Sequence, residues 1–312
     1  MTENKKILVI QPLPGIGDLL WFDAHMQALA ERASNKQVSL MTKRRSFATD
    51  IFKEAPHVEN IFWVDPNGHV SLWGLVKELR KGIFTEVWIL HPSWKYTVAA
   101  TLARIPKIYG YGRGLNGFLV TGKPLTPQEL TLHPIERATC LLKKNGISLK
   151  ENPKIIVSES LKESLKKRFS KIKRPWVVLG IGGSEPKKKW SPAYFIELAT
   201  WLKTQKASVF ILGGEQERAE ARSIVHKAKD AHAVTDLSLP EVMAFLDLSD
   251  VFIGNDTGTL NMAATLNKPA IGLFLASPVL NYRPTLYGTT PSEDRKIFPQ
   301  QVMDMIEKKK IM

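Results

Sequence analysis

The sequence predicts an α/β protein built from two domains, each of them a parallel β-sheet wound with helices. Short apolar runs alternate with segments of helical periodicity along almost the whole chain, which is the pattern of a doubly wound sheet. The alternation pauses once, at Asn145–Lys154, where Gly146 and Pro153 disfavour both helix and strand. The chain has 312 residues, which is enough for two domains of ordinary size. We therefore expect one domain at residues 1–150 and a second at residues 155–294.

In the first domain, apolar runs predict the strands, and amphipathic segments between them predict the helices. The expected strands are Lys6–Ile10, Val38–Met41, Ile61–Val64, Val87–Leu90 and Lys107–Tyr111. The expected helices are Leu19–Arg32, Phe47–Lys53, Leu72–Arg80, Tyr96–Arg104 and Pro134–Lys144. The glycine-rich stretch Gly112–Lys123 should be a loop.

In the second domain the alternation resumes. The expected strands are Ile155–Val157, Val177–Ile181, Val209–Leu212, Val251–Ile253 and Pro269–Phe274. Two helix starts carry capping signals: Ser160 with Glu163 has the spacing of a capping box, and Ser191 precedes Pro192 at a first helical position. Further helices are expected at Glu215–Ala228, Leu239–Leu246, the segment that ends at Asn267, and Pro299–Lys309.

The composition limits the kinds of protein this can be. With 44% hydrophobic and 24% charged residues, it is typical of a soluble globular protein. No apolar run is long enough to cross a bilayer and the chain enters its first strand directly, so we expect no signal peptide and a cytoplasmic location. The net charge of +14 favours a phosphorylated substrate or an acidic membrane face as partner over nucleic acid, for which no sequence signature is present. The single cysteine, Cys140, excludes an internal disulfide, and the histidine spacing predicts no metal site.

Gly254–Gly258 is a polar turn between a buried strand and a helix. The first N–H groups of a helix have no partner within the helix and carry partial positive charge, so such a turn can bind a phosphate. Gly258 has no Cβ to obstruct the approach of a ligand. Asp256 could instead be only the N-cap of the helix, and Gly258 only a packing glycine. The turn alone leaves both interpretations open.

The residues around this turn resemble the C-terminal signature of glycosyltransferase family nine, the heptosyltransferase-like glycosyltransferases. In that signature an Asp-Ser/Thr-Gly turn precedes an alanine-rich helix and a proline-initiated strand that ends in Leu-Phe. The matching residues here are Asp256, Thr257, Gly258, Ala263, Ala264, Pro269, Leu273 and Phe274. The resemblance implies the GT-B fold, an α/β architecture of two Rossmann-like domains that face each other across a cleft holding the active site. It also implies that the terminal helix Pro299–Lys309 packs back on the first domain.

Asp18 is the expected catalytic residue. It lies on the loop after the first strand, which in a parallel sheet faces the binding crevice. From the residues alone, a role as helix N-cap would be favoured. The family's first motif is Gly-Asp followed by apolar residues, and the resemblance of Gly17-Asp18 to it implies that Asp18 is the general base for the acceptor hydroxyl. A dinucleotide fingerprint starting at Gly15 fails, because Leu20 stands in place of its third glycine.

The resemblance also implies a site for the donor phosphates. A lysine two residues before a tryptophan binds the donor pyrophosphate in the family, and this register selects Lys188 within the run Lys187–Lys189. Protein charge would then stabilise the leaving diphosphate in place of a metal ion. A run of three lysines could also be only a solvated loop. The other residues expected at these phosphates are Ser184, Asp256, Thr257, Gly258 and Asn261.

Glu217 and Gly213 are expected at the nucleoside of the donor, because the family commonly has a glutamate after the corresponding strand. The spacing favours Glu217 over Glu215, although a glutamate in a first helical turn could serve the helix dipole alone. Gly17, Lys95 and Arg113 are expected on the acceptor side, where the two cations could contact acidic groups.

Two residues depart from the family pattern. Asn261 stands where a histidine usually contacts phosphate, so a hydrogen bond could be kept but a charge would be lost. Leu275 stands where a glycine usually follows Leu-Phe. Both positions belong to the expected donor site, so they bear on the identity of the donor and on activity.

The expected function is inverting, metal-independent transfer of a heptose or related sugar from an ADP-activated donor to a lipopolysaccharide core acceptor. The nucleotide sugar is a substrate, and no cofactor is expected. The expected partners are this donor, an anionic glycolipid acceptor and, as a peripheral contact, the inner face of the cytoplasmic membrane. Three alternatives stay open: transfer with another nucleotide sugar or a protein or glycan acceptor, a nucleotide-sugar epimerase of the same architecture, and a degenerate member that binds nucleotide sugar without turnover.

Overall fold

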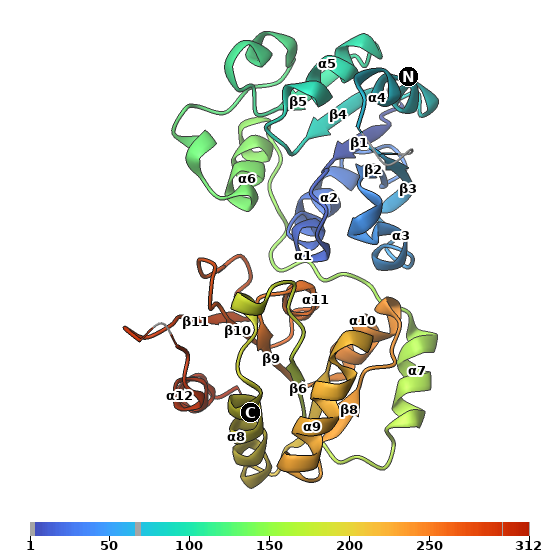
Figure 1. Cartoon of the computed structure of the whole chain (residues 1–312). Coiled ribbons are helices and arrows are strands. Elements are labelled where there is room, and N and C mark those ends of the chain that lie inside the picture. The colour runs from blue at the N-terminus through green and yellow to red at the C-terminus, as the bar shows by residue number, and fades with distance from the viewer. Residues whose placement is uncertain (1–3, 66–69, 295, 312) are drawn as a thin grey trace. The chain divides into compact units, whose positions relative to one another are not determined.

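The computed structural model describes residues 4–65, 70–294 and 296–311. The chain divides into two compact units, Met1–Pro153 and Lys154–Met312, and each contains a parallel β-sheet with helices packed against it (Figure 1). The boundary lies inside the expected linker Asn145–Lys154. Among the described residues, no helix is both long enough and apolar enough to span a bilayer.

The sheet of the first unit has five strands among its described residues, in the order β3-β2-β1-β4-β5. The strand order reverses between β1 and β4, and ligands of such sheets bind beside this switch point, at the carboxyl ends of the strands. All five expected strands form, although β3 starts three residues before the expected Ile61. Their bounds are β1 Ile7–Ile10, β2 Val38–Thr42, β3 Val58–Trp63, β4 Glu86–Ile89 and β5 Lys107–Gly110.

The helices of the first unit follow the expected order with one correction. The single helix expected at Leu19–Arg32 is wrong, because the chain forms a short helix, turns at Trp21 and Phe22, and then forms a second helix. The second helix begins at the buried Asp23, whose carboxylate lies 3.1 Å from the His57 ring and accepts a hydrogen bond from Gln27. The described helices are α1 Ile16–Leu20, α2 Asp23–Ala30, α3 Ala48–Ile51, α4 Leu72–Lys81, α5 Trp94–Leu102 and α6 Pro134–Lys144, with 3₁₀ turns η1 Arg44–Ser46, η2 Gly114–Leu119 and η3 Glu129–Thr131.

The described part of the second unit contains a six-stranded sheet in the order β11-β10-β9-β6-β7-β8. The strand expected at Ile155–Val157 does not form. Ile155 is buried, but this segment pairs with no strand and instead bonds to the end of a helix through the Thr265 carbonyl. The strand bounds are β6 Trp176–Gly180, β7 Ser208–Leu212, β8 His232–Val234, β9 Val251–Asn255, β10 Ala270–Leu273 and β11 Leu286–Thr289.

The helices of the second unit also require a correction. The capping box expected from Ser160 and Glu163 is wrong: Ser158 is the N-cap, and its hydroxyl accepts a weak bond of 3.5 Å from the Leu161 N–H. Glu163 instead forms an ion pair with Lys166 one turn later. The described helices are α7 Glu159–Arg168, α8 Pro192–Thr204, α9 Arg218–Ala228, α10 Leu239–Leu248, α11 Gly258–Thr265 and α12 Pro299–Lys309, with 3₁₀ turns η4 Pro186–Lys188 and η5 Glu215–Glu217.

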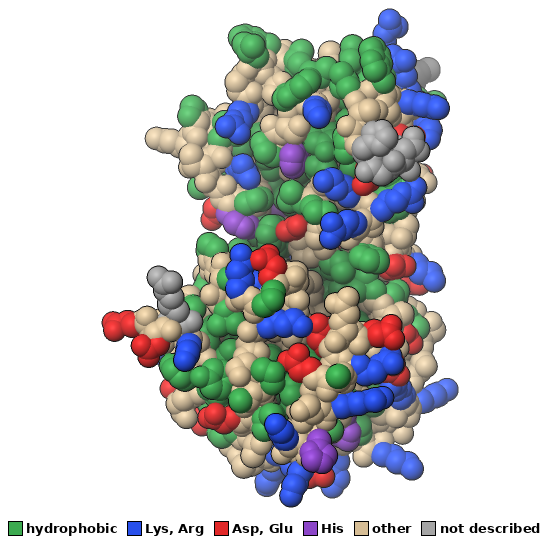
Figure 2. All heavy atoms as spheres, viewed as in Figure 1, with side chains coloured by type: hydrophobic (Ala, Val, Ile, Leu, Met, Phe, Trp, Pro, Cys, Tyr) green, Lys and Arg blue, Asp and Glu red, His purple; other side chains and the backbone are tan. Residues whose placement is uncertain are grey.

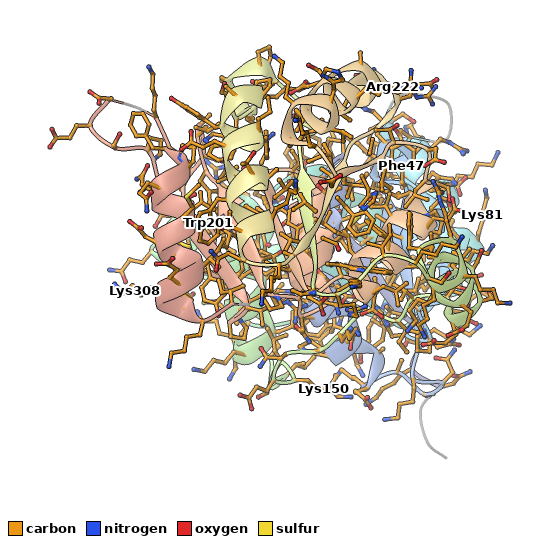
Figure 3. All side chains as sticks on the ribbon, turned by 90° about the horizontal axis from the view of Figure 1, so that it is seen from below. Phe47, Lys81, Lys150, Trp201, Arg222 and Lys308 are labelled. Carbon is orange, nitrogen blue, oxygen red and sulfur yellow. The ribbon has the colours of Figure 1, made fainter. Side chains whose placement is uncertain are left out.

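The terminal helix α12 forms where the sequence predicted it, at Pro299–Lys309. Val302, Met303 and Ile306 are buried in the core of the second unit. Figure 3 shows α12 beside α8, with Trp201 of α8 near the contact between them. The apolar face of α12 is thus used within the second unit, and its packing on the first domain stays a prediction.

A row of glycines crosses the second sheet and brings α11 close to it. Gly180, Gly254, Gly272 and Gly288 are aligned in register on the adjacent strands β6, β9, β10 and β11. A Cβ on Gly180 would lie 2.5 Å from the Phe252 ring, and one on Gly272 would lie 2.7 Å from the Leu260 side chain of α11. Because these glycines have no side chains, the Phe252 and Leu260 side chains can occupy the space beside them. Any larger residue at the glycine positions would displace these neighbours.

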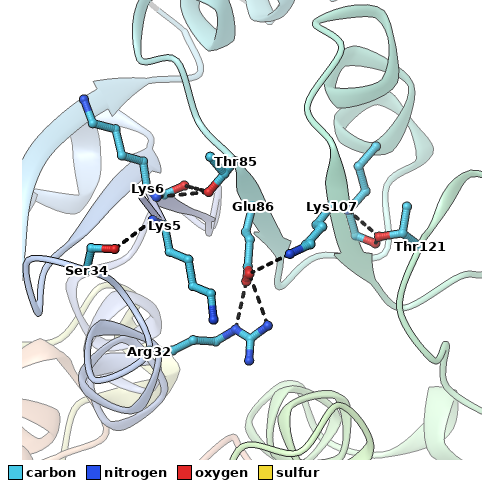
Figure 4. A network of polar contacts seen from close by, with 9 residues as sticks. Lys5, Lys6, Arg32, Ser34, Thr85, Glu86, Lys107 and Thr121 are labelled. Carbon is cyan, nitrogen blue, oxygen red and sulfur yellow. Dashed lines mark hydrogen bonds and ion pairs between the residues drawn. The ribbon is translucent and has the colours of Figure 1, made fainter. Parts of the chain in front are cut away.

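In the first sheet, a buried carboxylate holds the amino ends of two strands together. Glu86, at the start of β4, accepts two hydrogen bonds of 2.9 and 3.1 Å from the Arg32 guanidinium and lies 4.0 Å from the Lys107 ammonium (Figure 4). The hydrogen bonds to Glu86 raise the pKa of Arg32. This network joins Arg32, two residues after the end of α2, to the amino ends of β4 and β5, on the edge away from the loops that follow the strands.

We predict that Gly254→Ala destabilises the protein. The new Cβ would lie 2.6 Å from the Gly180 carbonyl oxygen, so backbone has to move, and overpacking of this kind costs about 1–3 kcal/mol of the free energy of unfolding. Chemical denaturation would measure the loss. Gly182→Ala is the matched control, since its Cβ would come no closer than 4.0 Å to another group. Equal stability of the two variants would show that the glycine row is not a packing requirement.

Candidate active site

The residues expected on the acceptor side lie at one edge of the first sheet. Gly17 and Asp18 follow β1, Lys95 follows β4, and Arg113 follows β5. These three strands are neighbours and parallel, so their following loops share the carboxyl edge. Lys95 and Arg113 are exposed, and neither forms an ion pair with another residue in the described ranges.

Asp18 is the third residue of α1, so it is not the N-cap; Gly15 holds that position. The Asp18 carboxylate accepts a hydrogen bond of 3.2 Å from the Gly15 N–H, and the Gln11 side chain donates one of 3.3 Å to the Asp18 carbonyl. Asp18 is half-buried. Its carboxylate is thus held in the first turn of a helix while part of the residue stays accessible, a geometry compatible with proton transfer at the surface of the unit.

His133 is a neighbour of Asp18 to which the sequence analysis assigned no role. Its ring lies edge-on to Trp21, with 5.0 Å between ring centroids, and it precedes α6. Burial lowers the pKa of His133, while the carboxylates of Glu136 and Asp18 act in the opposite direction. The signal that could have found it is a histidine directly before Pro134, but nothing local in the sequence pairs it with the β1 loop.

His91 lies on the loop after β4 and is held neutral by its surroundings. Burial lowers the pKa of His91 to about 4, and the nearby charges of Lys43 and Arg137 add to the effect. The Nδ1 atom of His91 accepts a hydrogen bond of 3.1 Å from the Ser93 N–H, which requires that nitrogen to be unprotonated. Arg137 also stacks over the Tyr111 ring at 5.5 Å. Lys43 and Arg137 therefore bring positive charge to this edge from elements far apart in the sequence.

In the second unit, Asn255 joins the loops that carry the expected donor-site residues. It is the last residue of β9 and is fully buried. Its side-chain nitrogen donates to the carbonyls of Ile181 and Gly182 at 3.0 Å each, and its oxygen accepts from the Trp190 N–H at 2.9 Å. One amide thus holds both ends of the loop that follows β6. The sequence analysis did not identify this role.

The ion pairs distinguish the three lysines of the run Lys187–Lys189. Lys187 pairs with Glu185 and Lys189 pairs with Glu217, each at 2.9 Å. Lys188, between them, is half-buried and forms no ion pair with any residue that the structure describes. Lys188 is therefore the member of the run whose ammonium is available for a ligand.

Glu217 and Glu215 differ in the direction of their side chains. The Glu217 side chain is 11% exposed and accepts hydrogen bonds from Lys189 and, at 3.1 Å, from the Gly214 N–H. The Glu215 side chain is 85% exposed. A Cβ on Gly213 would lie 2.7 Å from the Cβ of Glu217, so the glycine permits this inward position. The inward orientation agrees with the spacing that favoured Glu217.

At the start of α11, Asp256 accepts a short hydrogen bond from the Ser277 hydroxyl, and the Thr257 and Thr259 hydroxyls lie 3.0 Å apart. Thr257 is the N-cap, and its side chain makes no capping hydrogen bond to a helical N–H. Gly258 is the first residue of α11 and has no Cβ at this position. Ser184, on the loop after the adjacent β6, is exposed.

Asn261 lies in the first turn of α11, and its side-chain amide is hydrogen-bonded within the second unit. It is buried, its side-chain nitrogen donates to the Thr257 carbonyl at 2.9 Å, and its oxygen accepts from the Tyr282 hydroxyl at 2.7 Å. The amide therefore supports the first turn of α11 from within the unit, and its contact with a donor phosphate stays a prediction. Leu275, the other departure, packs against the core of the second unit.

The comparison with known proteins identifies the family. The profile of glycosyltransferase family 9 (heptosyltransferase) matches residues 72–301, which is most of the chain. The chain belongs to glycosyltransferase family 9. It is accordingly a glycosyltransferase, and the family assignment favours sugar transfer over the epimerase alternative. No group of three or more His, Cys, Asp or Glu side chains in the described part of this family 9 enzyme is arranged to hold a metal ion.

Relatives of this family 9 enzyme cover nearly its full length. Lipopolysaccharide heptosyltransferase 2 of Salmonella typhimurium is 21% identical over 290 residues, covering 86% of this chain and 82% of the relative. The solved structure of Escherichia coli ADP-heptose lipopolysaccharide heptosyltransferase II aligns with a TM-score of 0.76 and 20% identity over 97% of both chains. E. coli heptosyltransferase WaaC with ADP-2-deoxy-2-fluoro heptose aligns with a TM-score of 0.73 and 15% identity, covering 97% of this chain and 99% of WaaC. The fold class is GT-B, as predicted.

We predict that His91 makes the enzyme less stable in acid. Its folded pKa of about 4 lies below the ordinary value of 6.5, so between these values the unfolded chain binds a proton that the folded protein does not. The free energy of unfolding should therefore fall as the pH decreases from 6.5 towards 4. In His91→Gln, which keeps an acceptor for the Ser93 N–H, the fall should be shallower. Urea unfolding of both proteins at about pH 7.5 and about pH 5 measures the free energy of unfolding. An equal loss of stability in the wild type and in His91→Gln would refute the role given to His91.

Proposed function

We propose that this enzyme transfers a heptose from ADP-heptose to the core region of lipopolysaccharide, with inversion and without a metal ion. The observation that carries the proposal is the ion-pair pattern of the lysine run, which leaves Lys188 available on the loop joined by Asn255 to the strand before α11. Family membership supports sugar transfer, and a structural relative binds an ADP-heptose analogue.

The donor diphosphate would be held by fixed positive charge. Lys188 supplies an ammonium, Ser184 a hydroxyl, and the first N–H groups of α11, next to Thr257 and Gly258, supply donors with no partner inside the helix. Asp256 and Ser277 hold the turn in shape. As the glycosidic bond breaks, charge accumulates on the departing ADP, and donors already in position stabilise it. Glu217 and Gly213 are assigned to the nucleoside end of the donor.

Asp18 would act as general base in a single displacement. The acceptor hydroxyl loses its proton to the Asp18 carboxylate while its oxygen bonds to the anomeric carbon of the donor. The bond from that carbon to the phosphate oxygen breaks on the opposite face, so the configuration inverts and ADP leaves with the electron pair. Gly17, Lys95 and Arg113 are assigned to the acceptor side, where the two cations suit an anionic glycolipid. We place the enzyme in the cytoplasm, at the inner face of the membrane.

For the donor site, we predict that Lys188→Ala weakens ADP binding roughly 10- to 100-fold, the effect of losing one charge-assisted hydrogen bond to phosphate. Isothermal titration calorimetry with ADP, GDP and UDP is the measurement. Lys187→Ala is the matched control and should bind ADP normally, because Lys187 is already paired with Glu185. Equal loss in both variants would reject the selection of Lys188. Preferential binding of GDP or UDP would contradict the ADP-heptose donor while leaving the family assignment unchanged.

For the catalytic step, we predict that Asp18→Asn lowers turnover at least about 100-fold while ADP affinity stays unchanged. Asparagine keeps an oxygen that can accept from the Gly15 N–H, so this hydrogen bond at the helix start is kept while the basic group is lost. The assay follows product formation from ADP-heptose and a heptose-deficient core acceptor. Wild-type turnover in this variant would remove Asp18 from the mechanism and leave it with a purely structural role.

A further inference from the structure

The 3₁₀ turn η2, Gly114–Leu119, exposes two large apolar side chains. Leu115 is 84% exposed and Phe118 is 88% exposed. Residues three apart in a 3₁₀ helix project from the same side, so these two side chains point in a common direction. Trp94, in the first turn of the adjacent α5, is a further 51% exposed. We call Trp94, Leu115 and Phe118 the apolar patch.

The exposure of these side chains is not required by the turn. Gly112 and Gly114 have φ values of +67° and +60°, and together they provide the left-handed backbone that the turn needs on each side of Arg113. A polar residue at position 115 or 118 would satisfy the same backbone. Large apolar groups so exposed to water mark an interaction surface more often than a structural need.

The charged residues of the segment that carries the apolar patch are all positive. Residues 87–128 include no aspartate or glutamate, although they include Lys95, Arg113 and Lys123. These three cations are exposed, and none forms an ion pair with another residue that the structure describes. In Figure 2, hydrophobic side chains gather over α5 and the segment that follows β5, with cations beside them. A surface that is apolar at its centre and basic around it is complementary to an anionic lipid layer.

We infer that the apolar patch docks on an anionic membrane, with Leu115 and Phe118 inserted among the lipid head groups and Lys95, Arg113 and Lys123 facing lipid phosphates. A second copy of the chain is a poorer partner, because two surfaces without acidic residues would repel each other. The inference deepens the proposed position at the membrane face and rests on it, but it depends on the patch and not on the sugar-transfer reaction.

The test is vesicle co-sedimentation of the full chain without donor. Vesicles of phosphatidylcholine containing roughly one third phosphatidylglycerol should bind it, pure phosphatidylcholine should bind it less, and added salt should weaken the binding. The double variant Leu115→Ser/Phe118→Ser should lose at least about tenfold in binding, and Arg113→Gln about fivefold. Ile83→Ser is the matched control: this side chain is 80% exposed but lies before β4, on the opposite edge of the sheet, so binding should be unchanged.

Two results would overturn the inference. One is equal vesicle binding by the wild type and the double variant. The other is a concentration-dependent dimer in gel filtration that the double variant lacks, since the partner would then be a second copy. ADP titration of the same proteins separates this test from the proposed function, because the double variant should bind ADP as the wild type does whether or not it binds lipid.

Discussion

The second unit depends on the buried amide of Asn255. A parallel sheet places the loops after β6 and β9 at one edge, but it does not set their positions to within a hydrogen bond. Asn255 does so with three bonds, two to carbonyls at the start of the β6 loop and one to the Trp190 N–H at its end. Trp190 in turn donates its indole N–H to the Ile297 carbonyl at 2.7 Å. Because buried polar groups are costly to leave unpaired, this arrangement has few alternatives.

The fixed loop places charges of opposite sign in an order that leaves one cation without a partner. Glu185 and Glu217 pair with the lysines on each side of Lys188, so the central ammonium is the one left to a ligand. The start of α11, which follows the neighbouring strand β9, is also supported by hydrogen bonds from other segments. The Asn261 amide and the Tyr282 hydroxyl occupy the interior behind the first turn, and Ser277 bonds to Asp256. The paired side chains therefore fix the positions of the Lys188 ammonium and of the first turn of α11. Such fixed groups form a site that is preorganised for a charged ligand.

The first unit separates stability from binding at the two ends of its sheet. At the amino ends, the buried Glu86 is bonded by Arg32 and lies near Lys107, so this carboxylate is used within the fold. At the carboxyl ends, the exposed cations Lys95 and Arg113 have no acidic neighbour in residues 87–128. The first unit therefore presents its positive charge at the edge where its one catalytic candidate, Asp18, also lies. That distribution suits an anionic acceptor carried by a lipid surface.

The sequence by itself determined the α/β fold class, most strands, and the turns that hold Asp18 and Asp256–Gly258, since these follow from apolar periodicity and local turn chemistry. It did not reveal the short edge strands β8 and β11, which bury one face at most and carry little apolar pattern. It also joined α1 and α2 into one helix, because the break at Trp21 and Phe22 depends on tertiary contacts. Tertiary structure alone decided which lysine is unpaired, that Asn255 joins the loops, and that Asn261 faces Tyr282. Lys189, Asn255 and Asn261 each bond to a residue distant in the chain, and local periodicity carries no information about distant partners.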